Sequence, residues 1–382
     1  MENQPLDFDY QSTTPCSKGV VRAMQPYWNE FWANPSDRQN RSGLHMSASI
    51  GLARDKLANC LGVKPERLIF TSGATEANNL ALLGYSRAKA IEIGNPGHVI
   101  TISTEHHAVL DPLKQLKREG FRVTQLVPDS EGILSSEKLI EAFQDDTFLV
   151  SIMLANNEIG VIQSLEDFSK LCQSRGIVLH SDAAQAFGYL PINVEQMGID
   201  YLSISGHKIY GPKGIGALVI RESFPIQPLI WGGGQENGIR AGTLPVPLVI
   251  GFAEAASIAI NDLSLNNKKL TFLRDKLWND LQSQIPDLIV NGSLDRRLPH
   301  NLNFTILGIT GSRLKKRLRP FINYSSASAC SNGSPSHVLM AIGRTMKEAE
   351  SSLRLSIGRE MEEKDINSAV SVIKKAVNEL RA

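Results

Sequence analysis

The chain has 382 residues, and 42% of them are hydrophobic, so it can bury a core for two domains or for one large domain with a smaller appendage. Its 40 lysine and arginine residues nearly balance 39 aspartate and glutamate residues, which argues against a dedicated nucleic-acid binder. Neither a signal peptide nor a run of about 18 apolar residues is visible. We therefore expect a cytoplasmic protein without a membrane partner or a direct nucleic-acid partner.

Short apolar runs alternate with segments of helical period in the first part of the chain. Strands are predicted at residues 67–70, 98–102, 148–153, 177–179, 201–204 and 216–220. Helices are predicted from residue 75 to about 84, at 108–119 and at 165–175. This alternation is typical of βαβ units, so the predicted fold class is α/β with a mainly parallel sheet between helices.

The pattern changes after about residue 260. A helix at 270–284, a strand at 302–306 and a terminal helix at 364–380 follow one another there. We interpret this part as a second, smaller α+β domain. The predicted domains are a large one at residues 16–258 and a small one that combines residues 1–15 with residues 259–382.

Four cysteines stand far apart, with no C-x-x-C pair, so neither a zinc ribbon nor a disulfide framework is indicated. Cys60 and Cys172 lie in helix-like segments and are interpreted as packing residues. Cys16 follows a proline and is interpreted as structural. Cys330 lies in the small, polar sequence SSASACSNGSP, which is typical of an exposed loop where a thiol can ionise and attack.

A lysine at the end of a predicted strand is the first candidate for chemistry. Lys208 lies in SGHKIYGPKG at residues 205–214, among glycines. A desolvated lysine loses its proton readily and can form a Schiff base. The alternative is a turn lysine without a chemical task.

An aspartate follows another predicted strand, where open α/β sheets bind their ligands. Asp182 lies in HSDAAQ at residues 180–185, and a carboxylate there could pair with the pyridine nitrogen of a pyridoxal cofactor. Asp182 could instead cap a following helix. It could also bind a metal with His180, but no third ligand has a suitable spacing, so no metal site is predicted.

The sequence TSGATE at residues 71–76 lies between a predicted strand and a predicted helix. Backbone amides at a helix N-terminus, next to small hydroxyl residues, can bind a phosphate. A capping box, in which Glu76 reaches back to the helix start, is the alternative.

The order of these three segments is that of a pyridoxal-phosphate enzyme. From Asp9 to about Gly358 the chain resembles the cysteine desulfurases, fold-type I enzymes of the aminotransferase class V superfamily. The motifs that carry the resemblance are TSGATE at 71–76, TEH at 104–106, NNEIG at 156–160, GHK at 206–208 and RAGT at 240–243. The resemblance implies a large cofactor-binding domain with a seven-stranded type of sheet and a small domain that carries the cysteine loop.

The resemblance also implies site residues. The cofactor, pyridoxal 5'-phosphate, would be bound by Ala74, Thr75, His106, Asn157, Asp182, Gln185, Ser205, His207 and Lys208. Among these, Lys208 would be the imine-forming lysine, and His106 would stack on the ring and move protons. Thr243 would reach the phosphate of the other subunit, which implies a homodimer. The substrate carboxylate would contact Arg354, with help from Asn34 and Asn157.

The resemblance implies that Cys330 accepts sulfur from L-cysteine as a persulfide, since it matches the family's Ser-x-Ser-Ala-Cys motif. The product would be L-alanine, and the sulfur would pass to acceptor or scaffold proteins for iron–sulfur cluster assembly or tRNA thiolation. The segment after Cys330 departs from the family pattern, because it is about two residues shorter and lacks a Leu-Glu pair. Three alternatives stay open: a selenocysteine lyase, a cystine C–S lyase and a non-catalytic sulfur-transfer scaffold.

Overall fold

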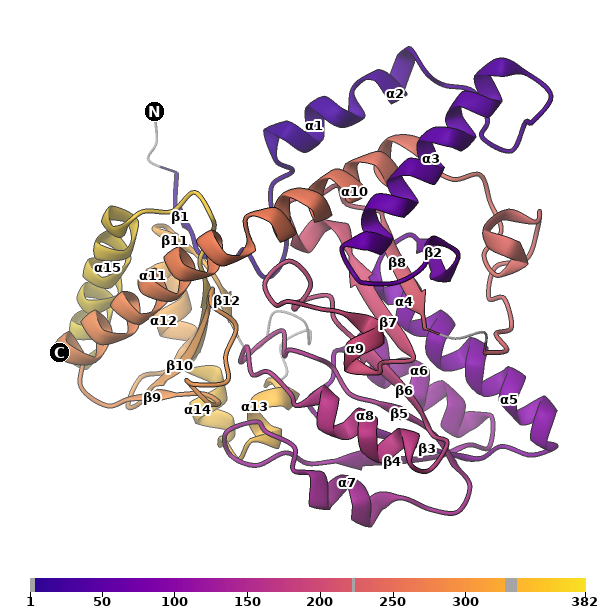
Figure 1. Cartoon of the computed structure of the whole chain (residues 1–382). Coiled ribbons are helices and arrows are strands. Elements are labelled where there is room, and N and C mark those ends of the chain that lie inside the picture. The colour runs from indigo at the N-terminus through magenta and orange to yellow at the C-terminus, as the bar shows by residue number, and fades with distance from the viewer. Residues whose placement is uncertain (1–3, 222–223, 327–334) are drawn as a thin grey trace.

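In the computed structural model, which describes residues 4–221, 224–326 and 335–382, the largest element is a seven-stranded sheet (Figure 1). Its strand order is β2-β8-β7-β6-β5-β3-β4. The strands are β2 (Leu68–Thr71), β3 (His98–Ile102), β4 (Arg122–Leu126), β5 (Thr147–Ser151), β6 (Val178–Asp182), β7 (Tyr201–Ser205) and β8 (Gly216–Ile220). Only the two pairs that involve β8 are antiparallel. The predicted α/β fold with a mainly parallel sheet is confirmed.

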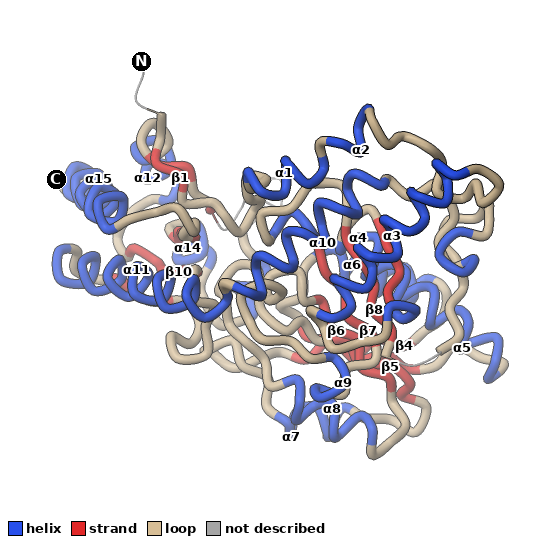
Figure 2. The backbone as a smooth tube through the Cα atoms, turned by 45° about the horizontal axis from the view of Figure 1, so that its top comes forward, coloured by secondary structure: helices blue, strands red, loops and turns tan. Residues whose placement is uncertain are grey.

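Helices cover both faces of this sheet, as a buried parallel sheet requires. Successive residues of a strand point to opposite faces, so Leu68 and Phe70 join one apolar cluster while Ile69 joins the other. The first cluster includes residues of α1 (Lys18–Met24), α3 (Arg41–Asn59), α7 (Ser136–Ala142), α8 (Leu165–Gln173), α9 (Val194–Met197) and α10 (Val246–Asn261). The second includes residues of α4 (Ala74–Asn79), η2 (Leu80–Gly84), α5 (Tyr85–Ile93) and α6 (His107–Arg118). In Figure 2, α3 and α10 lie together across the sheet.

The structure differs from the predicted elements in places that matter for the site. Strand β6 continues to Asp182, so this residue ends a strand instead of starting a helix. The helix predicted from residue 75 begins at Ala74 and continues through a π-helical turn at Leu80–Gly84 into α5. Strand β4 was not predicted, because this edge strand is only partly buried and has mixed polarity.

A second, four-stranded sheet lies in the C-terminal part, with the order β12-β13-β10-β9. Its strands are β9 (Leu288–Val290), β10 (Asn301–Ile306), β12 (Ser325–Ser326) and β13 (Ser352–Ser356). The helices around it are α11 (Leu263–Gln284), α12 (Gly311–Leu318), α13 (His337–Ala341), α14 (Met346–Glu350) and α15 (Glu363–Arg381).

The N-terminal strand β1 (Leu6–Asp7) pairs in parallel with β11 (Ile322–Asn323), so the start of the chain lies against its C-terminal part. Helix α10 runs through residue 258, where a domain boundary was predicted. The predicted domain limits therefore stay a prediction.

Across the described ranges, no single helix is long and apolar enough to cross a membrane. Helices α10 and α11 meet at a bend of 71°. Only when they are counted together are their length and composition sufficient for a membrane span.

A buried ion pair holds α3 against the edge of the large sheet. Glu236 has a side chain that is 2% exposed and accepts two hydrogen bonds from Arg54, at 2.5 and 3.1 Å. It also accepts the backbone N–H of Phe70 at 2.7 Å. Glu236 adopts a left-handed conformation, with φ 47°, which a non-glycine residue takes only when its surroundings impose it.

We predict that Arg54→Ala lowers the unfolding free energy by about 3 kcal/mol, because it leaves a buried carboxylate without its cation. Lys56→Ala, on the same helix, removes a partly exposed pair with Glu254 and should change stability by less than about 1 kcal/mol. Urea denaturation of the two variants measures the difference. If the two variants lose equal unfolding free energy, the Arg54–Glu236 pair contributes no more to stability than the partly exposed pair.

Candidate active site

A cavity of about 580 Å³ opens where β2, β6 and β7 end, which is the edge where α/β sheets bind ligands. It is within the range of volumes that small-molecule and cofactor sites occupy. Ten of the predicted site residues line it: Ala74, Thr75, His106, Asn157, Asp182, Gln185, Ser205, His207, Lys208 and Arg354.

Lys208 ends a short 3-10 turn, η3 (Gly206–Lys208), that follows β7 directly. Its ammonium donates hydrogen bonds to the carbonyls of Gln11 and Ser12, at 2.6 and 2.8 Å. These two residues line the cavity but were missed in the sequence, because they lie almost 200 positions away from Lys208. Lys208 is thus held at the cavity wall by backbone oxygens.

Asp182 is fixed in the cavity wall by two donors. Its Oδ2 accepts a hydrogen bond from Asn78 Nδ2 at 2.7 Å, and its Oδ1 accepts the backbone N–H of Ala184 at 2.9 Å. Asn78 was also missed, although its position two residues after the TSGATE motif, on the same predicted helix, was a usable signal. The capping alternative for Asp182 is wrong, since turns and not a helix follow the strand, and the bond from Ala184 closes one of these turns.

His180, the other residue of the discarded metal site, lies entirely in the core. Its ring contacts the hydroxyls of Ser151 and Ser203, at 2.8 and 3.1 Å. Burial lowers its pKa to about 3, so it is a neutral structural histidine. Within the described residues, no group of three or more His, Cys, Asp or Glu side chains is placed to hold a metal ion.

His106 is the N-cap of α6, and its Nδ1 accepts the backbone N–H of Ala108 at 3.0 Å. An accepting Nδ1 carries no proton, so the neutral ring has its proton on Nε2. Burial lowers the pKa of His106, which Asp182 partly offsets and Lys208 reinforces. The ring therefore enters the site as a neutral donor at its Nε2.

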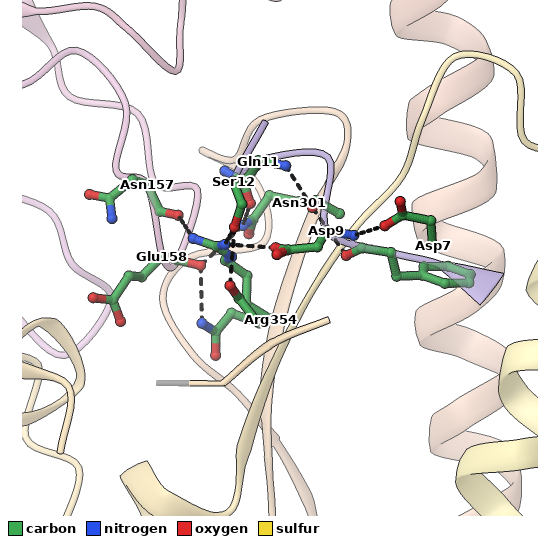
Figure 3. Close-up of polar contacts among 12 residues, drawn as sticks. Asp7, Asp9, Gln11, Ser12, Asn157, Glu158, Asn301 and Arg354 are labelled. Carbon is green, nitrogen blue, oxygen red and sulfur yellow. Dashed lines mark hydrogen bonds and ion pairs between the residues drawn. The ribbon is translucent and has the colours of Figure 1, made fainter. Parts of the chain in front are cut away.

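Arg354 projects from β13 toward the N-terminal segment (Figure 3). Arg354 is 7% exposed, and its guanidinium donates to the backbone carbonyl of Asn157 at 2.7 Å, to Asp9 at 2.9 Å and to the Ser12 hydroxyl at 2.8 Å. Its Nε is buried with no partner among the described atoms. A ligand carboxylate at this place would meet a cation whose charge Asp9 already shares.

Two predicted residues are not brought to this cavity. Asn34 and Thr243 are exposed and do not line it. The residues next to them, Pro35 and Leu244, instead line a second cavity of about 610 Å³. Cys330 lies outside the described residues. The individual roles assigned from the sequence therefore stay predictions.

The lining fits pyridoxal phosphate. Asn157 Oδ1 is buried without a protein partner in the described chain, as expected of an atom reserved for a ligand. Strand β8 approaches the TSGATE segment so closely that a Cβ on Gly216 would lie 2.7 Å from the Gly73 backbone. This contact supports backbone amides at the start of α4, where a phosphate would bind.

Comparison with known proteins gives the class first. Residues 7–368 match the family Aminotransferase class-V. Among solved structures, a NifS-like protein superposes with a TM-score of 0.91 at 35% identity and covers 99% of this chain and 100% of its own. SspA, solved in complex with cysteine, gives 0.81 at 38%, covering 92% and 98%. The chain belongs to the class-V aminotransferases and is a pyridoxal-phosphate-dependent enzyme.

The relatives then narrow the class. The chain is 43% identical over 382 residues to proteins named cysteine desulfurase IscS in Rickettsia bellii and Rickettsia typhi, covering 99% of this chain and 92% of each relative. The resemblance seen in the motifs is confirmed, and within its family the chain is a member of the cysteine desulfurases.

We predict that Asn78→Ala weakens cofactor retention about tenfold, because Asp182 loses a buried hydrogen bond to its carboxylate. The neighbouring Asn79 points to the carbonyl of Thr75 on the exposed side of the same helix, so Asn79→Ala is the matched control. Cofactor content after dialysis, read from the near-visible absorbance, measures the effect. Equal retention by the two variants would contradict a role for Asn78 at the site.

Proposed function

We propose that this enzyme removes sulfur from L-cysteine, with Cys330 as the residue that receives it and L-alanine as the product. The observation that carries the proposal is the convergence of Lys208, Asp182 and Arg354 on one cavity from three separate parts of the fold. A base, an anion for a ring nitrogen and a cation for a carboxylate are the groups that this chemistry requires.

Each residue has a defined task in this proposal. Asp182 and the TSGATE segment would hold pyridoxal phosphate, which would supply an electron sink for the substrate α-carbon. Arg354 binds the substrate carboxylate in exchange for part of its contact with Asp9 and Ser12. Lys208 leaves the two backbone carbonyls that hold it and takes the α-proton at Nζ.

The sulfur transfer itself needs a thiolate. Cys330 attacks the substrate sulfur, so that an S–S bond forms while the C–S bond breaks and the carbon keeps the bonding electrons. The organic product takes up a proton to become alanine. His106, neutral and with its proton on Nε2, is placed in the cavity wall to supply or hold such a proton.

We further propose a homodimer. Three large aromatic side chains are exposed: Trp28 58%, Trp32 80% and Trp231 78%. The segments of the last two lie near the predicted contact residue Thr243, because Pro35 and Leu244 line one cavity and Gly232 approaches Ala241. Exposed apolar surface of this kind favours a partner. Thr243 does not line the cavity of its own subunit. If it contacts the cofactor phosphate, it must therefore do so in the cavity of the second subunit.

For the destination of the sulfur, we propose acceptor or scaffold proteins, with iron–sulfur cluster assembly ahead of tRNA thiolation. The family membership and the near-complete coverage of relatives named IscS support that order. A cytoplasmic location is proposed on the same sequence grounds as before.

We predict that Cys330→Ala retains the cofactor absorbance and its response to L-cysteine, while alanine formation falls at least a hundredfold. Cys16→Ala, which removes a different, partly exposed thiol, should behave like wild type. Alanine, pyruvate and sulfide are measured for cysteine, selenocysteine and cystine. Pyruvate with ammonia would favour a C–S lyase, and normal alanine formation by Cys330→Ala would exclude this thiol as acceptor.

We predict that a mixed dimer of Lys208→Ala and Thr243→Val subunits has one site with normal cofactor affinity. That site has its own Lys208 and receives Thr243 from the other subunit. If Thr243 acts within its own subunit, the single competent site will keep the weak affinity of the Thr243→Val homodimer. A monomer by light scattering would refute the proposal outright.

A further inference from the structure

The charge of the chain is uneven in one place. Residues 296–347 contain nine lysine and arginine residues and no aspartate or glutamate, whereas acidic residues make up about one in ten of the whole chain. This span includes Cys330. Not all of it is surface: Arg297 is buried and binds backbone carbonyls, and Arg344 bonds to Asn291 and Val290.

The surface part of this charge is concentrated on α12, which has the sequence GSRLKKRL. Leu314 and Leu318 are buried, so the helix is anchored by one face. Arg313, Lys316 and Arg317 lie on its exposed face, and Arg319 follows as an exposed residue. The simplest interpretation is that α12 is a solvated surface helix. That interpretation explains the charges.

An apolar groove next to these charges is not explained by solvation. It has a volume of about 360 Å³ and lies between the end of α12 and α15. Phe321, 55% exposed, lines it with Pro320 and Val372, and the charged residues of the lining are Lys316, Arg317, Lys375 and Glu379. An exposed aromatic ring bordered by three cations and one carboxylate is typical of a contact site for a partner and not of free surface.

We infer that the surface formed by α12, Phe321 and Lys375, called the α12 groove below, binds an acidic segment of the protein that accepts sulfur from this enzyme. The inference rests on the proposed function for the identity of that partner. Carboxylates of the partner would face Arg313, Lys316 and Arg317, and one apolar side chain would rest on Phe321.

Charge complementarity selects an acidic occupant, and the surroundings of the groove select a protein over a nucleic acid. Arg317 pairs with Glu379 of α15 at 3.4 Å, and Glu350 lies close enough to Lys315 to affect its pKa. Glu379 belongs to the groove lining itself, and Glu350 lies near the basic helix, so an extended phosphate backbone would meet carboxylates as well as cations. A short acidic segment can be bound within the strip.

The position of the α12 groove along the chain fits delivery of sulfur. From Phe321 the chain continues through β11 and β12 and reaches Cys330 within nine residues. Figure 1 shows α12 and β12 in the same C-terminal part of the molecule.

The test uses the full-length holoenzyme and a fluorescent peptide of alternating glutamate and aspartate around one leucine. A peptide with glutamine and asparagine in their place is the first control. We expect the acidic peptide to bind in a salt-sensitive manner and the triple variant Arg313→Glu, Lys316→Glu, Arg317→Glu to bind it at least about tenfold more weakly. Phe321→Ser should also weaken binding, with little change in salt dependence.

A matched variant separates a local effect from net charge. Lys114→Glu, Lys117→Glu, Arg118→Glu makes the same charge change on the exposed end of α6 and should retain affinity. The inference is wrong if this variant loses binding, or if the wild-type enzyme binds the amide peptide as tightly as the acidic peptide. If polyuridylate binds more tightly than the acidic peptide, and the α12 variant loses this binding, the groove binds nucleic acid and the inference is wrong.

Two further readouts connect binding with sulfur transfer. Alanine formation with dithiothreitol as acceptor should be normal in every variant, so a failure there for wild type would refute the proposed function and not the groove. A cysteine added to the acidic peptide should accept sulfur faster than in the amide peptide: its thiolate attacks the outer persulfide sulfur, and Cys330 leaves as thiolate. This faster transfer to the acidic peptide should disappear in the α12 variant. If it persists there, the inference is wrong.

Discussion

The site depends on the N-terminal segment of residues 9–14, which connects the two sides of the cavity. Its backbone carbonyls at Gln11 and Ser12 hold the Lys208 ammonium, while Asp9 and the Ser12 hydroxyl hold Arg354. Thr14 adds hydrogen bonds to the turn after Lys208, through the carbonyl of His207 and the N–H of Tyr210. A short polar segment thus sets the position of a lysine and an arginine that come from different sheets.

Burial then determines the protonation of the groups around the cavity. Glu105 is fully buried, and burial, followed by the nearby Asp182, raises its pKa well above the usual value. Burial lowers the pKa of His207 to about 4, with help from Lys208 and Lys213. The lining therefore places histidines with lowered pKa values beside the anchored side chain of Asp182. Such shifted pKa values are typical of sites that move protons.

The surface divides the remaining tasks. Aromatic residues near Thr243 are exposed where a second subunit is proposed, and the basic α12 groove lies in the C-terminal part that leads to Cys330. Cofactor chemistry and sulfur delivery are thereby assigned to different parts of one chain. The long sequence separations involved explain why the fold, and not any single motif, brings these functions together.

The sequence by itself determined six of the seven strands of the large sheet, the family and ten of the residues that line the cavity. Lys208, Asp182 and the TSGATE segment could be found because each lies at the end of a strand, where local apolar periodicity and motif spacing are informative. Only the tertiary structure decided that Gln11 and Ser12 bind Lys208, that Asn78 fixes Asp182 and that Asp9 shares the charge of Arg354. Those contacts join residues from 104 to 345 positions apart, and local periodicity carries no record of which distant side chains packing will bring together.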